Sequence, residues 1–272
     1  MRGGWDSRCL NRTRWLQRRL MPAYVPIDEA RAMKGLRLVL TAYPGPPWTE
    51  AAKAVFHVKR IPYVPVAQQP MATNEALQEW TGHDNAPIAV WDDERPRTGW
   101  AEILALAERL APEPRLVPAD LEDRVRMFGL ANEICGEDGL GWNRRLLLIA
   151  GTYDQGAKGV ADYLAVRYGY GEAAAKRAPD RIAEIVRALR DQLRAQQARG
   201  RRFLVGDALS ALDLYWAAFA ALIEPLPPDL CPMPDFLRSM YTYDPALRRD
   251  AADLFAHRDR IYRDHLELPV VG

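Results

Sequence analysis

Cysteine and histidine are scarce in this chain, whose 272 residues include three cysteines and four histidines. Cys9, Cys135 and Cys231 are widely separated, so they fit neither a disulfide framework nor a zinc-ligand spacing. A few unpaired cysteines favour a reducing compartment. His257 and His265 have no second carboxylate–histidine pair at ligand spacing, and we interpret both as surface residues. The sequence therefore predicts a cytoplasmic protein without a bound metal.

An excess of one charge and long apolar runs are also missing. The chain has 37 lysines and arginines against 36 aspartates and glutamates, a formal net charge of +1. This balance gives no overall field that would attract nucleic acid or an anionic membrane. No apolar run approaches the roughly 18 residues that a membrane-spanning helix needs. We therefore predict neither a nucleic-acid partner nor a membrane partner.

The first 35 residues differ in composition from the rest. Residues 1–20 carry six arginines against one aspartate and lack the apolar core of a signal peptide. We interpret them as a disordered tail, or as sequence upstream of a start at Met21; a transit peptide or an anion-binding arm is the alternative. Residues 21–34 are expected to form a lead-in with one turn of helix. Residues 1–20 are thus excluded from the fold, and residues 1–35 as a whole are predicted to be a disordered or lead-in extension.

One stretch near the C-terminal end predicts a fully buried helix. Residues 203–223 read FLVGDALSALDLYWAAFAALI, and no charge follows Asp213 until Glu224. Ser210 precedes Asp213 by three positions, which is the spacing of a capping box. In a capping box, the side chain of each residue accepts a hydrogen bond from the backbone N–H of the other. A helix that is apolar on all sides belongs inside a domain. We therefore expect it to be the central helix of the fold.

Residues 36–118 alternate between strand-like and helix-like segments. Strands are predicted at 36–41, 61–66 and 88–91, and helices at 49–59, 74–80 and 100–110. Prolines at 112, 114 and 118 predict a linker. Beyond it the patterns are helical, most clearly at 120–135, 142–149 and 182–197.

This order of elements resembles the glutathione S-transferase family, in which a thioredoxin-like α/β domain precedes an all-helical bundle domain. The resemblance rests on the element order, on Pro87 before the third strand, and on the run from Phe203 to Asp213. It implies a thioredoxin-like glutathione-binding domain at 36–111, a linker at 112–118 and an all-helical domain at 119–272. It also implies a homodimer that uses glutathione as co-substrate.

The resemblance also indicates where glutathione would bind. Pro87 matches the family's cis proline, which would let the Ala86 backbone pair with the cysteinyl part of glutathione; a trans proline opening a strand is the alternative. The family's acidic residue or glutamine and its serine, which hold the γ-glutamyl group, correspond to Gly99 and Trp100. Arg97 and Thr98 could substitute for them. The predicted glutathione-binding residues are Trp48, Asn85, Ala86, Pro87, Arg97, Thr98, Gly99 and Trp100.

The catalytic position departs from the family in a second way. Its serine or cysteine corresponds to Pro46, which has neither a hydroxyl nor a thiol. Tyr43 and Thr49 flank this position, and a hydrogen bond from either to the thiolate would lower the pKa of glutathione. The alternatives are a packed loop aromatic for Tyr43 and a helix N-cap for Thr49. Trp48 either stacks on a ligand or closes the pocket.

In the helical half, the resemblance places the acceptor-substrate pocket beside the segment 142–149. Trp142 and Arg145, with Arg144 next to them, are predicted to meet an acidic or aromatic substrate; two arginines on a solvated helix face are the alternative. Four tyrosines between residues 153 and 170 could wall the same pocket.

The predicted function is the transfer of glutathione thiolate to a small electrophilic or aromatic substrate. One alternative is a non-catalytic binding or interaction protein that kept the fold and lost the chemistry, as Pro46, Gly99 and Trp100 suggest. Another is an enzyme of this fold that uses a different ligand, with Trp48 and Trp100 filling the γ-glutamyl pocket. Glutathione binding without turnover would indicate the first alternative, and absence of glutathione binding the second.

Overall fold

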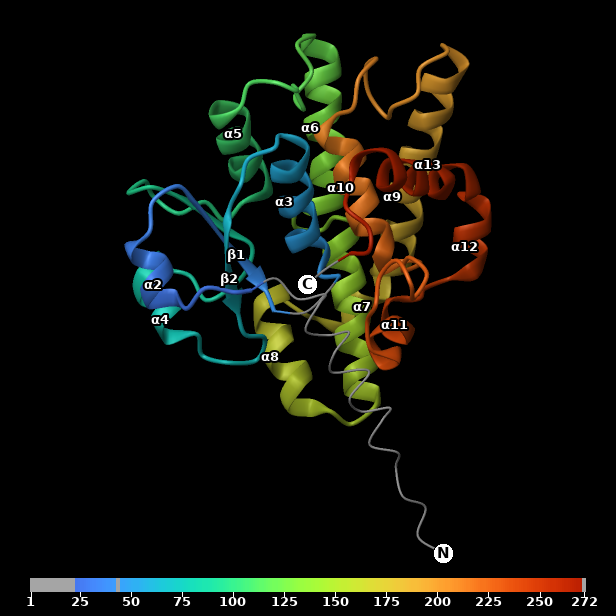
Figure 1. Ribbon diagram of the computed structural model, residues 1–272. Coiled ribbons are helices and arrows are strands. Elements are labelled where there is room, and N and C mark those ends of the chain that lie inside the picture. The colour runs from blue at the N-terminus through green and yellow to red at the C-terminus, as the bar shows by residue number, and fades with distance from the viewer. Residues whose placement is uncertain (1–22, 43–44, 271–272) are drawn as a thin grey trace, which may run out of the picture.

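The computed structural model describes residues 23–42 and 45–270, which form an N-terminal α/β domain followed by a helical domain (Figure 1). The tail predicted at 1–20 and the position of Tyr43 lie outside the described residues. No helix within the described ranges is long and apolar enough to cross a membrane.

The N-terminal domain is built on a three-stranded mixed sheet. β1 (Leu36–Thr41) is the central strand, parallel to β2 (Val64–Gln68) and antiparallel to β3 (Ile88–Trp91). Beyond β3 the chain turns back and makes one isolated bridge, from Ala89 to Arg97. β2 begins later than predicted, because Arg60 (φ 54°) and the residues up to Tyr63 first redirect the chain after the preceding helix.

Helices cover both faces of this sheet. Side chains alternate along β1, so Leu38 and Leu40 face α3 (Pro47–Val58) and α5 (Trp100–Leu110), whereas Val39 packs in the cluster beneath α2 (Ile27–Ala32) and α4 (Glu75–Thr81). Because both faces are covered, the first five residues of β1 are buried.

The segment before β1 belongs to this packing. Val25 forms a parallel bridge with Val66 of β2, and its N–H donates to the carbonyl of Pro65. Ala30 of α2 is fully buried. The predicted lead-in segment therefore pairs with the sheet at Val25 and packs against it at Ala30.

The helical domain contains eight α-helices and one short 3-10 turn within the described ranges. They are α6 (Leu121–Cys135), α7 (Leu140–Asp154), α8 (Lys158–Tyr168), α9 (Glu172–Ala198), α10 (Ala211–Phe219), η1 (Ala220–Leu222), α11 (Asp235–Tyr241), α12 (Pro245–Asp250) and α13 (Ala252–His265). The apolar repeat behind the prediction starts at Ile182, whereas α9 begins at Glu172 and continues through Pro179, which lacks the N–H of a regular helical residue.

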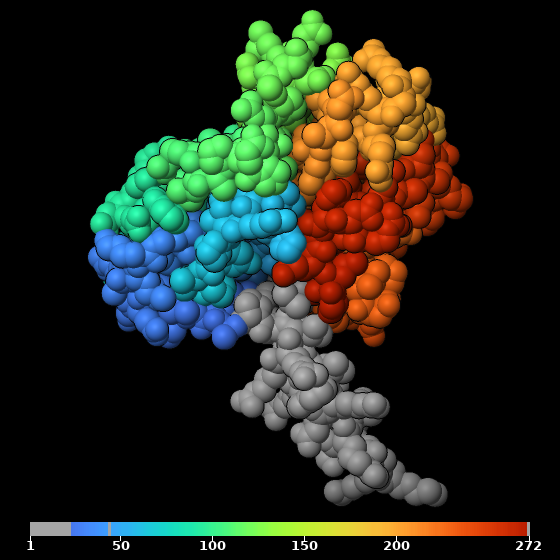
Figure 2. All heavy atoms as spheres, turned by 45° about the horizontal axis from the view of Figure 1, so that its top comes forward, coloured from blue at the N-terminus to red at the C-terminus, as the bar shows by residue number. Residues whose placement is uncertain are grey.

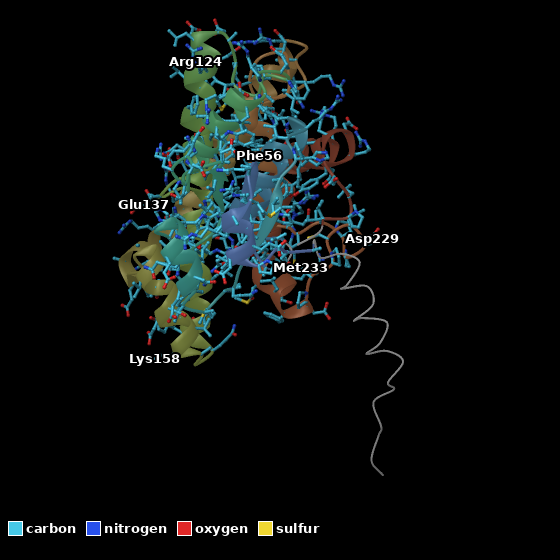
Figure 3. The ribbon with its side chains drawn as sticks, turned by 60° about the vertical axis from the view of Figure 1, so that its left-hand side comes forward. Phe56, Arg124, Glu137, Lys158, Asp229 and Met233 are labelled. Carbon is cyan, nitrogen blue, oxygen red and sulfur yellow. The ribbon has the colours of Figure 1, made fainter. Side chains whose placement is uncertain are left out.

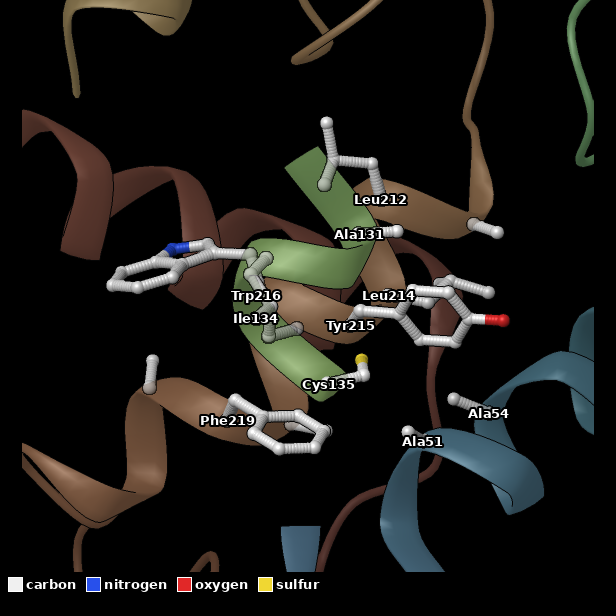
Figure 4. Packing of buried hydrophobic residues seen from close by; sticks show 14 of the residues in the cluster. Ala51, Ala54, Ala131, Ile134, Cys135, Leu212, Leu214, Tyr215, Trp216 and Phe219 are labelled. Atoms are coloured by element: carbon white, nitrogen blue, oxygen red, sulfur yellow. The ribbon is translucent and has the colours of Figure 1, made fainter. Parts of the chain in front are cut away.

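α10 is the buried centre of the molecule, as the sequence predicts. All its residues are buried, and it packs against α6 and against α3 of the N-terminal domain (Figure 4). Trp216 and Phe219 are fully buried. The capping box is present: the Asp213 carboxylate accepts from the N–H of Ser210 at 2.9 Å and from its hydroxyl at 2.8 Å.

The prediction that His257 is a surface residue is wrong. His257 is 1% exposed, and its Nε2 lies 2.8 Å from Oδ1 of Asp213, which also accepts from the N–H of Leu204 at 2.9 Å. The reason is that α13 packs against α10, which brings the histidine to the capping carboxylate. His265, at the end of α13, is half-buried beside the ring of Phe203.

A buried lysine ties α3 to the linker. The side chain of Lys59 is fully buried, and its ammonium donates to the carbonyls of Ala111 (2.8 Å) and Pro114 (2.9 Å) and pairs with Glu108 (2.5 Å). A buried cation requires such partners. In Figure 2, part of the N-terminal domain, in cyan, lies directly against the last helices, in red.

Candidate ligand site between the two domains

The sequence-predicted residues Trp48, Pro87, Thr98 and Trp100 converge at the junction of the two domains. They line one cavity together with residues of α3, α6 and α10. The volume of this cavity is about 20 Å³, which is room for about one water molecule. The fold therefore brings the predicted ligand residues together, but side chains fill the space between them.

The loop before β3 presents backbone that is free to pair. The Ala86–Pro87 peptide bond is cis. Neither the N–H nor the C=O of Ala86 has a hydrogen-bond partner within the described ranges. Asn85 is exposed, Ala86 is half-buried, and Pro87 is buried. This unpaired backbone could accept an extended peptide as an added strand.

The N-terminus of α5 is partly occupied by a carboxylate of the chain itself. Gly99 is the N-cap, and Oε2 of Glu102 lies 3.5 Å from its N–H. Glu102 also pairs with Arg95 at 2.8 Å, and this arginine is the main reason that the pKa of Glu102 lies below its usual value. A ligand carboxylate at this helix end would compete with Glu102 for the same N–H groups.

Arg97 points into a different network. Its guanidinium bonds the carboxylate of Glu94 at 2.5 Å and the carbonyl of Arg95 at 2.9 Å, and Glu94 also pairs with Arg109. These contacts hold the turn after β3 together. Thr98, the next residue, is exposed at the cavity. We predicted that Arg97 and Thr98 would substitute for the family's polar pair. The guanidinium of Arg97 is engaged by Glu94, whereas Thr98 lies at the cavity.

The start of α3 differs from the prediction. The helix begins at Pro47 with Pro46 as its N-cap, so Thr49 is not the cap. Thr49 is 1% exposed, and its Oγ1 lies 3.3 Å from both the N–H and the hydroxyl of Thr41 on β1. The physical reason is that proline is favoured at the first helical position, where its missing N–H is not needed. The buried hydroxyl of Thr49 links α3 to the sheet.

Trp48 joins the two domains. Its indole N–H donates to the carbonyl of Cys135 at 2.9 Å, and its ring meets that of Phe219 edge-on at a centroid distance of 4.9 Å. Gly141 on α7 permits this packing, since a Cβ there would lie 2.8 Å from the Trp48 ring and closer still to Phe219. The alternative that Trp48 closes the pocket matches these contacts.

Trp100 also faces the helical domain. Its ring meets Tyr215 of α10 edge-on at 5.6 Å and lies 6.0 Å from Phe128 of α6. The neighbouring thiol of Cys135 is fully buried, and this burial raises its pKa well above 9.0. Cys135 therefore remains a neutral thiol at the bottom of the cavity.

The two residues predicted for the acceptor pocket contact other aromatic side chains. The ring of Trp142 packs edge-on against Tyr168 of α8 at 5.0 Å. The Arg145 guanidinium lies 5.9 Å from the ring of Trp48 and bonds the hydroxyl of Tyr241 at 3.3 Å. The predicted acceptor-pocket residues therefore lie near the predicted glutathione residue Trp48: Arg145 contacts it directly, and Tyr168 contacts both Trp48 and Trp142.

Arg144 is buried, so a solvated face for both arginines is excluded. It donates to the carbonyl of Leu222 at 2.7 Å and of Met240 at 3.1 Å, and stacks on the ring of Tyr243 at 4.2 Å. Burial lowers its pKa to about 10. These contacts make Arg144 a structural residue that joins α7 to the segments after α10.

The sequence indicated Tyr168 as one of four tyrosines that could wall the pocket, but it gave no sign of the ion pair that Arg167 makes beside it. Arg167 of α8 pairs with Asp84 at 2.5 Å, and Tyr168 lies 6.1 Å from Trp48. The tyrosine-rich stretch was the available signal for Tyr168, whereas no local pattern pairs Arg167 with a residue 83 positions away.

Other features of the described residues lie apart from this site. A larger cavity, of about 640 Å³, is on the opposite face of α3, and none of the sequence-predicted site residues lines it. Within residues 23–42 and 45–270 there is no group of three or more histidines, cysteines, aspartates or glutamates that could hold a metal ion.

Comparison with solved structures identifies the fold. A glutathione S-transferase from Methylobacterium radiotolerans, in complex with glutathione sulfonate, superposes with a TM-score of 0.59 at 16% identity, covering 85% of this chain and 92% of that one. The β-etherase LigF from Sphingobium gives 0.59 at 17% identity over 84% and 94%. A Tau class glutathione S-transferase from mango gives 0.58 at 17% identity over 85% and 89%. The sequence itself matches no family model and no curated protein.

This chain therefore has the glutathione transferase fold, in a form divergent in sequence. The prediction of a thioredoxin-like domain followed by a helical domain is confirmed. A shared fold does not determine the chemistry of the site, which must be argued from the residues that this chain has there.

Proposed function

We propose that this protein binds glutathione between its two domains and transfers the thiolate to a small electrophilic or aromatic acceptor. The observation that carries the proposal is the unpaired backbone of Ala86, which lies beside Pro87 and Thr98 at the domain junction. The cysteinyl backbone of glutathione would pair with Ala86 as a short added strand. Its γ-glutamyl carboxylate would bind at the N-terminus of α5, where it would displace Glu102 from Gly99.

The thiolate would form near the start of α3. Pro47 has no N–H, so the first helical N–H groups available to stabilise a thiolate belong to Trp48 and Thr49. Tyr43, which lies outside the described residues, remains the sequence-predicted hydrogen-bond donor to the thiolate. In the reaction, the thiol proton leaves to solvent, the sulfur forms a bond to the electrophilic carbon, and the leaving group departs with its bonding electrons.

A second candidate function is non-catalytic binding, and a specific observation favours it. The cavity of about 20 Å³ is too small for a tripeptide, and Trp48 and Trp100 fill the junction through contacts within the protein. On this alternative the fold binds a ligand or partner without turnover. The two candidates differ in one measurable property, which is conjugation of an electrophile.

Calorimetric titration with glutathione tests the proposal. We expect binding at micromolar to millimolar concentration, and weaker binding by Ala86→Pro, which removes the N–H that would pair with the ligand. His83→Ala is the matched control, because His83 is an exposed residue of the same loop outside the predicted set. Thermal melts of all three proteins verify folding. If the wild type binds no glutathione, the proposal is wrong.

Turnover is measured separately, with 1-chloro-2,4-dinitrobenzene and with an aryl ether as acceptors. The ether is included because one structural neighbour is a β-etherase. Conjugation that falls with Tyr43→Phe supports the transferase. Binding without conjugation of any acceptor supports the non-catalytic alternative.

A further inference from the structure

Helix α8 lies beside the candidate ligand site, packs against α7 and buries little of its own surface. Ala161 is its one buried residue, whereas α9 has eight. Val166 is 88% exposed. In Figure 1, α8 lies below the sheet, between the N-terminal domain and α7, and Lys158, its first residue, is at the edge of the molecule in Figure 3. A helix with one fully buried residue is expected to open more easily than the buried helices of the fold.

Glycines in the left-handed region stand at both ends of α8. Gly156 has φ 76° and precedes the helix, and Gly169 has φ 56° and is its C-cap. An added Cβ would meet nothing within 4 Å at either position, so packing does not hold these two turns. Short glycine-containing turns on both sides of an element can absorb the backbone rotation of a moving lid.

One ion pair connects α8 to the loop that carries the predicted glutathione residues. Arg167 Nη2 lies 2.5 Å from Oδ2 of Asp84, which immediately precedes Asn85 and Ala86. The Arg167 guanidinium also stacks on Tyr163 at 4.8 Å, which orients it. The two side chains are 19% and 43% exposed, so salt in the solvent can weaken the pair.

The residue next to Arg167 packs against two aromatic residues that the sequence predicted for the site. Tyr168 lies between Trp142, at 5.0 Å, and Trp48, at 6.1 Å, which are the aromatic residues predicted for the substrate pocket and the glutathione site. A planar aromatic ligand could use the same ring contacts if Tyr168 withdrew. Ring and ion pair are adjacent in sequence, so release of Arg167 would free Tyr168 as well.

We propose that α8 is a lid over the interdomain site, held closed by the Arg167–Asp84 ion pair, with Tyr168 filling the position that a planar aromatic acceptor takes when the lid opens. This inference rests on the proposed function for the identity of the ligand. The lid itself can be tested without any ligand, so the two ideas can fail independently.

Hydrogen–deuterium exchange of the free protein tests the ion pair. We expect the amides of residues 158–168 to exchange roughly threefold to tenfold faster in Arg167→Gln than in wild type, and those of α9 to be unchanged. Arg187→Gln is the matched control, because Arg187 is an exposed arginine of α9 with no partner among the described residues. Equal exchange of α8 in Arg167→Gln and wild type would overturn the lid.

A charge swap shows whether the pair acts directly. Arg167→Asp places two carboxylates together and should loosen α8 further, while the double variant Asp84→Arg/Arg167→Asp should restore slow exchange. Higher salt should accelerate exchange of α8 in wild type and change Arg167→Gln less. A double variant as loose as Arg167→Asp would contradict a direct latch.

Ligand binding then separates the lid from the proposed function. S-(2,4-dinitrophenyl)glutathione carries both the peptide and a planar aromatic group, and we expect Arg167→Gln and Tyr168→Ala to bind it roughly threefold to tenfold more tightly than wild type. If α8 loosens but no variant binds this probe or glutathione, the lid stands and the proposed function fails. If wild type binds the probe and Arg167→Gln changes neither exchange nor affinity, the lid fails and the function stands.

Discussion

The indole nitrogen of Trp48 donates a hydrogen bond of 2.9 Å to the carbonyl oxygen of Cys135, the last residue of α6. The final carbonyls of a helix have no partner within it. Here a side chain from the N-terminal domain supplies that partner for a helix of the other domain. The contact that couples the two domains is thus also the wall of the candidate ligand site.

Replacement of Trp48 tests this coupling. Trp48→Phe keeps a ring against Phe219 but leaves the Cys135 carbonyl unsatisfied, so we expect a loss of about 1–2 kcal/mol in the free energy of unfolding. Trp48→Ala also removes the ring and should cost about 3–5 kcal/mol. Urea unfolding measures both. Trp142→Phe is the control, since its indole makes no hydrogen bond within the described ranges; equal losses in the two phenylalanine variants would contradict the prediction.

Gly141 offers an independent test from the opposite side of the same contact. A Cβ at this position would lie 2.8 Å from Cζ2 of Trp48 and would also overlap the ring of Phe219. We therefore expect Gly141→Ala to lose about 1–3 kcal/mol from overpacking, despite the better helix propensity of alanine. Gly151→Ala in the same helix has open space around it and should be neutral or stabilising. Denaturant unfolding of Gly141→Ala and Gly151→Ala measures the two changes in the free energy of unfolding. Equal changes would exclude overpacking at Gly141.

The fold could be predicted from the sequence because its signals are local. The spacing of Ser210 and Asp213 and the apolar run after them specify α10, and the proline before Ile88 marks the start of β3. These patterns act within a few residues, which a sequence shows directly. The start of α9 was predicted too late because the apolar repeat becomes regular only at Ile182, ten residues after the helix begins at Glu172.

The site was less predictable because its contacts join distant segments. Trp48 and Cys135 are 87 positions apart, and Asp84 and Arg167 are 83 apart. Neither pair leaves a local pattern. Thr49 is different: the preference of proline for the first helical position could have placed the start of α3 at Pro47 and excluded Thr49 as the cap.

The buried Asp213–His257 contact should matter for stability more than the cap hydroxyl does. Asp213 accepts bonds from Leu204 and Ser210 and lies 2.8 Å from His257, all with the carboxylate fully buried. Removing one partner of such a network leaves buried polar groups unsatisfied, so Asp213→Ala should cost about 3–5 kcal/mol. Ser210→Ala leaves the carboxylate's other bonds and should cost about 0.5–2 kcal/mol. Thermal unfolding ranks the two, and an equal or reversed ranking would show that the carboxylate is not the centre of the network.

The buried thiol of Cys231 should make the free energy of unfolding fall at alkaline pH. Burial, with Glu50 as a smaller cause, raises the pKa of its thiol from 9.0 to about 11. The folded state therefore holds the proton more tightly than the unfolded state. Its contribution is fully present below about pH 9 and is lost as the pH rises through about 11. The size of this contribution is on the order of 3 kcal/mol.

In Cys231→Ala this titration is absent. We expect its free energy of unfolding to start about 1 kcal/mol lower at neutral pH, from lost packing, and then to fall less steeply than that of wild type between about pH 9 and pH 11. Burial also raises the pKa of Tyr63, to about 12. The loss of stability that this titration causes is the same in both proteins, so it cancels from the comparison. Urea unfolding at several pH values gives the two curves. If the two curves run parallel between about pH 9 and pH 11, burial does not raise the pKa of the Cys231 thiol as the structure implies.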